Sequence, residues 1–300
     1  MITVAAFYQF TRFPDPEGLR PAVLAAAVEH GIRGTILLAG EGINGTIAGP
    51  KSAVDAVLSK LRALPGCKAL RVQESQSETQ PFGRMKVRLK REIVTMGQPW
   101  VDPMTGAGQR VAAKDWNALI RAHDVAVIDT RNAYEVAIGS FQGAVDPATD
   151  SFGDFPGWWQ QNAHRFAGKR IAMFCTGGIR CEKSTAYLMS HGVADVFHLD
   201  GGILNYLETV APDDNLFDGE CFVFDGRVSV GPGLIQGPHQ NCHACRRPLT
   251  EADRASPRFE EGVACPHCAE DYSNSDRARF RERHRQMQLC AERGQRHLGA

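Results

Sequence analysis

The chain has 300 residues, which is enough for two domains and some additional segments. Its 34 basic residues balance its 34 acidic residues, so the net charge of +0 points to no class of partner. No apolar stretch is long enough to cross a bilayer, and the first residues lack the basic and apolar regions of a signal peptide. We therefore expect a cytoplasmic protein with no membrane partner.

Residues 1–95 alternate between strand-like and helix-like patterns. Apolar positions recur at helical spacing in 18–30 and again after Ser52, which is a suitable N-cap. Apolar runs typical of strands occupy 4–8, 34–38, 45–48, 69–73 and 85–89. The order βαββαβ predicts a small ferredoxin-like (acylphosphatase-like) α+β domain.

A basic stripe lies in the last of these strands. Arg84, Lys86, Arg88 and Lys90 alternate along the chain, so they share one face of the strand, and Arg91 follows. Such a face could bind the backbone of an RNA substrate. A solvated sheet face explains the same pattern equally well.

Residues 96–113 are rich in glycine and proline and are interpreted as a linker to a second α/β unit at 114–211. Nearly continuous apolar runs at 125–129, 171–174 and 196–199 are typical of buried parallel strands, and a helix is expected at 181–191. Repeated strand–helix–strand units predict a mostly parallel sheet covered on both faces. An active site is then expected on the rim where the strands end.

Cys175 ends the second of these apolar runs and begins the loop Cys175–Cys181. Gly177 and Gly178 allow backbone N–H groups to turn toward one point, and the helix that follows adds positive potential. Arg180 can further stabilise an anion there. The pattern predicts a nucleophilic thiol with a lowered pKa. The alternative is a buried cysteine followed by an ordinary turn.

Residues 212–240 form a connector with a possible hairpin at 221–230, and a cysteine-rich module follows at 241–272. Its two Cys-x2-Cys pairs have zinc-ribbon spacing. Four thiolates complete a tetrahedral site, so the predicted zinc is structural; free thiols are the alternative, and His243 and His267 are less suitable ligands. The predicted metal ligands are Cys242, Cys245, Cys265 and Cys268.

Two further patterns leave alternatives open. The basic tail at 273–300 could contact phosphates or be a solvated terminus. It carries arginines at 277, 279, 281, 283, 285, 293 and 296. The aromatic residues of 152–159 could stack a base or, more simply, cover the sheet.

The second unit resembles the rhodanese-like sulfurtransferases. The resemblance rests on 127–131, on Glu135 and Gly139, on Gly143-Ala144, on the Cys175 loop and on 199–202. It implies that Cys175 carries a persulfide and that Asp129 and Arg131 support the rim. Ser140 stands where a histidine is frequent, and Cys181 stands where Ser or Thr usually caps the helix. Cys181 could resolve a persulfide or sulfenate as a disulfide, or it could be a small buried residue.

Most of the chain resembles a narrower family. The segments 39–46, 85–88, 91–94 and 175–183 are similar to those of the bacterial rhodanese-domain tRNA uridine hydroxylases. The resemblance implies an oxidoreductase with tRNA as its partner and O2 as co-substrate, which makes 5-hydroxyuridine at the wobble position. A persulfide sulfurtransferase and a non-catalytic RNA-binding rhodanese module are the alternatives. We recognise no organic cofactor, and a protein that donates sulfur or electrons is a further candidate partner.

Overall fold

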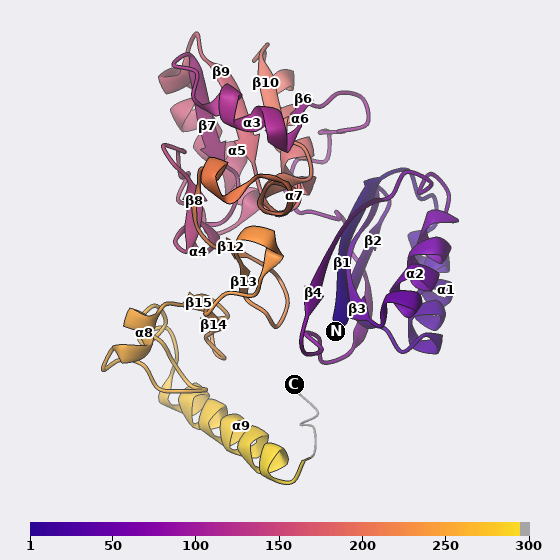
Figure 1. Cartoon of the computed structure of the whole chain (residues 1–300), viewed down its shortest axis with the longest axis vertical. Helices are drawn as coiled ribbons and strands as arrows, with labels where there is room; N and C mark the ends of the chain where they lie inside the picture. The colour runs from indigo at the N-terminus through magenta and orange to yellow at the C-terminus, as the bar shows by residue number, and fades with distance from the viewer. Residues whose placement is uncertain (295–300) are drawn as a thin grey trace.

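The computed structural model of the protein describes residues 1–294, which form two α/β domains and a C-terminal cysteine module (Figure 1). None of the helices in this part of the chain is both long and apolar enough to pass through a membrane. The predicted fold class is confirmed for all three parts. The last arginine of the predicted tail, Arg296, lies outside the described residues.

The N-terminal domain contains all five predicted strands and both predicted helices, and the fifth strand extends the βαββαβ order at the edge of the sheet. Its elements are β1 (Ile2–Phe10), α1 (Pro16–Glu29), β2 (Arg33–Ala39), β3 (Gly42–Gly49), α2 (Lys51–Arg62), β4 (Arg71–Ser77) and β5 (Met85–Leu89). The sheet order is β4-β1-β3-β2-β5, and β5 is parallel to β2 whereas the other pairs are antiparallel.

Alternation along the strands gives this sheet two different faces. Ala5, Phe7, Ile36 and Leu38 pack with α1 and α2 in the domain core. Their neighbours along each strand point the other way, because successive side chains of a strand alternate between faces. Figure 1 shows that α1 and α2 lie on the side away from the second domain, so the helix-free face points toward that domain.

The second domain contains the predicted parallel sheet, with strand order β6-β10-β9-β7. Its elements are β6 (Gln109–Val111), α3 (Ala113–Ile120), β7 (Val125–Asp129), α4 (Ala133–Val136), β8 (Gly139–Phe141), η1 (Phe152–Asp154), α5 (Phe155–Asn162), η2 (Ala163–Phe166), β9 (Arg170–Phe174), α6 (Ile179–Ser190), β10 (Val196–Leu199) and α7 (Gly202–Thr209). Strand β6 comes from the segment interpreted as a linker.

Both faces of this sheet are covered by helices. Val125 and Val127 pack with residues of α3 and α7, whereas Ala126 and Ile128 pack with residues of α5 and α6. The aromatic residues of 152–159 belong to the second of these cores, where Trp159 stacks on Phe166 at 5.7 Å. The interpretation that they cover the sheet is therefore confirmed.

The connector folds back on both domains. It contains η3 (Pro212–Asp214), β11 (Phe217–Gly219), β12 (Cys221–Phe222), β13 (Ser229–Val230) and η4 (Pro232–Leu234). The expected hairpin is present as β12 and β13. The N–H of Val223 donates to the carbonyl of Val228 at 2.9 Å. The loop of this hairpin is therefore four residues long, 224–227.

The cysteine module begins with the hairpin of β14 (Gln240–Asn241) and β15 (Pro248–Leu249), followed by α8 (Glu251–Ala255) and α9 (Asn274–Glu292). Helix α9 is capped by Ser273, whose hydroxyl accepts from the N–H of Asp276 at 3.1 Å. Phe280 packs α9 against the cysteines. The basic tail is therefore helical through residue 292, and Phe280 is its buried contact with the module.

Buried charges join the two domains. The Lys183 ammonium is 1% exposed and lies 2.8 Å from a Glu41 carboxylate oxygen and 2.6 Å from one of Glu92. It also donates to the carbonyl of Val94 at 3.0 Å. Glu41, Glu92 and Lys183 come from three different motifs of the family resemblance. This ion-pair cluster joins the N-terminal domain to α6 of the second domain.

Candidate active site

The Cys175 loop is shaped around its sulfur. Cys175 directly follows β9, and Gly178 has φ of 95°, a conformation that favours glycine. The Gly178 N–H donates to the Cys175 Sγ at 3.1 Å. Helix α6 begins at Ile179, so its positive end also faces the thiol. Gly178 thus provides one backbone N–H of the predicted cradle.

The loop's carbonyl groups point the other way, toward α7. The N–H groups of Ile203 and Leu204 donate to the carbonyls of Cys175 and Thr176 at 2.9 and 3.0 Å. A Cβ on Gly202 would lie 2.5 Å from the Cys175 carbonyl oxygen, so only glycine permits this approach. Gly202 and the two residues that follow it therefore fix the direction of the first two peptides of the loop.

Neighbouring groups lower the pKa of Cys175. Burial alone would raise it, but hydrogen bonds from the Cys181 thiol and from backbone N–H groups, together with the Arg180 charge, outweigh burial and bring the pKa to about 6. The pKa of Cys181 moves the opposite way, well above its usual range, because it is buried beside the Cys175 sulfur. The two thiols thus differ in charge near neutral pH, with the thiolate on Cys175.

Arg180 acts on this thiol while bound to a buried carboxylate. Its guanidinium donates to Glu135 Oε2 at 2.9 Å, and the Glu135 side chain is fully buried. Thr176 also donates to Glu135 Oε2, at 3.3 Å. The guanidinium is therefore fixed in place and largely buried, with its charge directed at Cys175.

The rim is supported by a second buried pair. Arg131 and Asp129 are both fully buried and are joined at 2.6 Å. Arg131 also donates to the carbonyl of Gly139, and the Ser140 hydroxyl donates to Asp129 Oδ2 at 2.8 Å. Ser140, which stands where the rhodanese resemblance implies a histidine, thus provides a hydrogen bond to the Asp129 carboxylate.

The thiol lines a cavity between the two domains. This cavity has a volume of about 570 Å³. One wall is the Cys175 loop with Gly201 and Leu204; the second is the helix-free face of the N-terminal sheet; the third is the 223–227 segment of the connector. Cys175 itself is 1% exposed, so a reacting molecule reaches it only from inside this space.

The sheet wall was not predicted from the sequence. Strand register aligns Arg71, Tyr8, Asn44 and Leu37 in one row across the helix-free face, and Gln73, Ala6, Thr46 and Thr35 in the next. The Tyr8 hydroxyl donates to Glu182 at 2.8 Å, which ties this wall to α6. The alternation of these side chains with core residues indicates in the sequence that the sheet has a second face. The sequence does not show that this face points toward the second domain.

The predicted basic stripe lies at the edge of this wall. Lys86 is the register partner of Thr35, and Arg88 is the partner of Leu37, so both cations share the face that lines the cavity. Arg84 precedes the strand on the same side. Within the described residues, none of the three forms an ion pair with an acidic group. An uncompensated cationic edge thus adjoins the cavity that contains Cys175.

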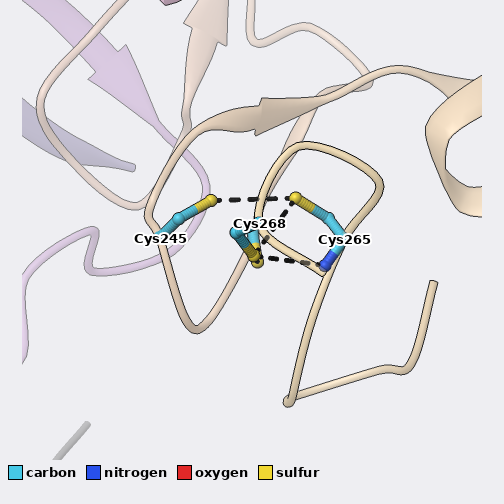
Figure 2. Close-up of side chains that lie close together, drawn as sticks. Cys245, Cys265 and Cys268 are labelled. Atoms are coloured by element: carbon cyan, nitrogen blue, oxygen red, sulfur yellow. Dashed lines mark hydrogen bonds between the residues drawn. The ribbon is translucent and has the colours of Figure 1, made fainter. Parts of the chain in front are cut away.

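The four cysteines of the C-terminal module come together. Figure 2 shows three of them, Cys245, Cys265 and Cys268. Their sulfur atoms all lie within 4.8 Å of one another, and none is in a disulfide. The Cys245–Cys265 separation is 3.7 Å, Cys265–Cys268 is 3.6 Å and Cys242–Cys268 is 3.9 Å. His267 instead pairs with Asp253 at 2.9 Å, so it is not directed at the cluster. The cluster could hold a metal ion.

Several arginines of the predicted tail are engaged within this module. Arg281 pairs with Glu260, and Arg279 with Asp276. Arg283 donates to the carbonyl of His243 at 2.8 Å and lies over the Phe280 ring. The contacts of Arg281 and Arg283 hold α9 on the module, and the pairs of Arg279 and Arg281 reduce the charge that remains for a polyanion.

Comparison with known proteins first defines the class of the chain. Residues 2–93 match the UPF0176 acylphosphatase like domain, and residues 112–209 match the Rhodanese-like domain. A rhodanese-like domain joined to an acylphosphatase-like domain therefore describes both the fold and the walls of the cavity.

Relatives over the full length define the family. The chain is 60% identical over 300 residues to the tRNA uridine(34) hydroxylase of Jannaschia sp. (strain CCS1), covering 100% of this chain and 99% of that protein. It is 59% identical to the protein of the same name from Ruegeria pomeroyi, covering 99% of each. The protein of that name from Roseobacter denitrificans is 58% identical, covering 98% of this chain and 99% of the relative. The chain belongs to the tRNA uridine(34) hydroxylase family, which confirms the resemblance inferred from its motifs.

Proposed function

We propose that this protein is a cytoplasmic oxidoreductase that converts the wobble uridine of tRNA to 5-hydroxyuridine with O2 as co-substrate. The observation that carries the proposal is a thiol of lowered pKa inside a cavity beside a cationic sheet edge, in a chain of this family. Cys175 is the reacting group. Arg180 and the N–H groups of the Gly177-Gly178 turn stabilise its thiolate.

Cys181 supplies the second thiol. Hydroxylation replaces C5–H by C5–OH with one oxygen atom of O2 and reduces the other to water, which consumes two electrons and two protons. Two thiols provide the two electrons and the two protons when they form one disulfide. In total, uridine, O2 and two thiols give 5-hydroxyuridine, water and a disulfide. Cys181 is in hydrogen-bonding contact with Cys175, so this pair fits the role. An external thiol donor then restores the reduced pair.

The cavity suits a single unpaired nucleotide. Its volume falls within the usual range of small-ligand sites, roughly 300–1,000 Å³. A base inside a duplex could not reach a thiol that is 1% exposed, whereas a base of the anticodon loop can turn out of the stack. This accounts for a substrate position in a loop rather than in a helical arm.

The cationic edge holds the RNA backbone in this proposal. Strands β5 and β1 are separated by β2 and β3, so Lys86 and Arg88 lie roughly 14 Å from Tyr8 at the usual strand spacing. Phosphates on either side of the extruded nucleotide can contact Arg84, Lys86 and Arg88 while the base enters the cavity. Affinity should then fall steeply with salt, because each neutralised phosphate releases counterions.

Mass spectrometry of tRNA nucleosides tests the function. A strain that lacks the protein should lose 5-hydroxyuridine from the wobble position, and the purified protein should form it only when oxygen is present. Replacing Arg84, Lys86 and Arg88 together with glutamine should weaken tRNA binding. The matched control replaces Arg20, Lys60 and Arg62, which are exposed on the opposite, helix-covered side of the domain.

The sulfurtransferase alternative makes a different prediction in the same assays. A protein that ignores tRNA at low salt yet rapidly transfers sulfur from thiosulfate would replace the hydroxylase proposal. Retention of 5-hydroxyuridine in the deletion strain would also contradict it.

We propose that Cys242, Cys245, Cys265 and Cys268 hold one structural zinc ion. Tetrahedral zinc with Zn–S bonds of about 2.3 Å places its sulfurs about 3.8 Å apart, which matches the separations of 3.6 to 3.9 Å. Elemental analysis should find about one zinc per chain. Cys268→Ser should lose it, whereas Cys290→Ser should retain it because Cys290 lies outside the cluster. A metal-free protein with an ordered module would contradict the proposal.

A further inference from the structure

Phe224 is an exposed aromatic ring on the wall of the cavity that contains Cys175. Its side chain is 57% exposed, although it lies between residues that are buried. A single exposed apolar residue is common on protein surfaces and has no meaning by itself. Phe224 differs from such a residue in three respects. Its ring lines the cavity, it contacts the loop that carries Cys175, and its own loop is rigidly held.

The ring directly contacts the residue that stabilises the thiolate. The Arg180 guanidinium carbon lies 5.6 Å from the centre of the Phe224 ring. Phe222 meets the same ring edge-on at 5.1 Å, with an angle of 87° between the planes. Since Arg180 is held by Glu135, the orientation of the ring is set by groups that are themselves fixed. More than half of the ring still faces open space.

The loop that carries Phe224 is clamped to the N-terminal domain. Arg227 and Asp225 form a buried ion pair at 2.7 Å, and Arg227 also donates to the Ser75 hydroxyl at 2.7 Å. The Gly226 N–H donates to the Pro81 carbonyl at 2.9 Å, and a Cβ at Gly226 would lie 2.8 Å from that oxygen. The loop therefore presents its ring in a preformed position, which lowers the entropic cost of binding a planar group.

We propose that Phe224 is the stacking platform for the unpaired pyrimidine base that enters the cavity. A flat ring on one wall of a cavity, with a cationic edge bordering another wall, is the combination that recognises single-stranded nucleic acid, because the cations bind phosphates and the ring stacks a base. The second domain's other aromatic cluster, at 152–159, lies within the core. This inference rests on the proposed function and assigns the base to one named side chain.

Binding of an anticodon stem-loop with a fluorescent pyrimidine analogue at the wobble position tests the platform. Stacking should quench the fluorescence on the wild-type protein. Phe224→Leu keeps an apolar side chain but removes the aromatic face, so quenching should be lost and the KM for tRNA should rise roughly 10- to 100-fold. Phe224→Trp should restore both. The matched control, Ile235→Ala, removes an exposed apolar side chain of the same connector and should change neither.

The outcomes separate this inference from the proposed function. Equal quenching and equal KM for wild type and Phe224→Leu would overturn the platform while the hydroxylase activity stands. A failure of the wild-type protein to bind the stem-loop at low salt would overturn both. Loss in Phe224→Leu with recovery in Phe224→Trp supports the platform, because the recovery shows that the loop remains folded.

Discussion

Replacing Cys175 with serine should lower tRNA hydroxylation by on the order of 10³-fold or more and leave the fold intact. Serine is nearly isosteric and can accept the Gly178 N–H, but it does not ionise near neutral pH. The activity is measured as formation of 5-hydroxyuridine in purified tRNA, and the fold is checked by thermal unfolding. Full activity of Cys175→Ser with a dead Cys181→Ser would show that the assignment of the two thiols is reversed.

The pH dependence of the same thiol is part of this expectation. The lowered pKa of Cys175 means that the thiolate predominates above about pH 6, so alkylation of the wild-type protein should rise through that value and then level off. Cys175→Ser should remove this phase. A first alkylation phase near the ordinary pKa of a cysteine would contradict the electrostatic account of the loop.

Replacing Lys183 with methionine should destabilise the protein by about 3–5 kcal/mol, the usual cost of removing one partner of a buried ion pair. Methionine fills a similar volume but leaves the Glu41 and Glu92 carboxylates without the buried cation that joins them. The free energy of unfolding is measured in urea. Exposed Lys51, which also pairs with two carboxylates, provides the control, and Lys51→Met should cause little measurable change.

Acid should weaken the same contact in the wild-type protein. Burial raises the pKa of Glu92, but its hydrogen bond from Lys183 and those from backbone N–H groups outweigh burial and lower it. A carboxyl with a lowered folded-state pKa stabilises the protein above its unfolded-state pKa, and this contribution is lost as pH falls through the folded-state pKa. Lys183→Met should therefore flatten the loss of stability in acid. If Lys183→Met left the free energy of unfolding and its pH dependence unchanged, a structural role for the contact of Lys183 with Glu41 and Glu92 would be contradicted.

Local patterns in the sequence were sufficient to predict most of the fold. The 2-residue and 3.6-residue periods identified the strands and helices of both domains, and the apolar run before Cys175 located the loop on the rim of a parallel sheet. Cysteine spacing likewise predicted that four sulfurs come together. These features depend on neighbours in the chain or on repeated local geometry, which a single sequence carries.

The remainder of the site depends on contacts between distant segments. Nothing local to Glu41 or Glu92 indicates that their partner is Lys183, and nothing local to Phe224 indicates that its ring lies against Arg180. The sequence placed the basic stripe at Arg84–Arg88 on one face of a strand. It did not show that this face of the sheet lies over the thiol, because that depends on how the two domains pack. Domain orientation arises from many weak contacts, and one sequence does not specify it in its local pattern.

The anchoring of Arg227 on Ser75 has a consequence for the order in which the protein matures on the ribosome. The two residues are 152 positions apart, and the strands of both main sheets have been synthesised before Arg227. The core of the second domain, however, also contains Val230 and Leu234 of the connector, which follow Arg227 in the chain. A nascent chain therefore completes the second domain and the third wall of the cavity together, only after the connector has left the ribosome.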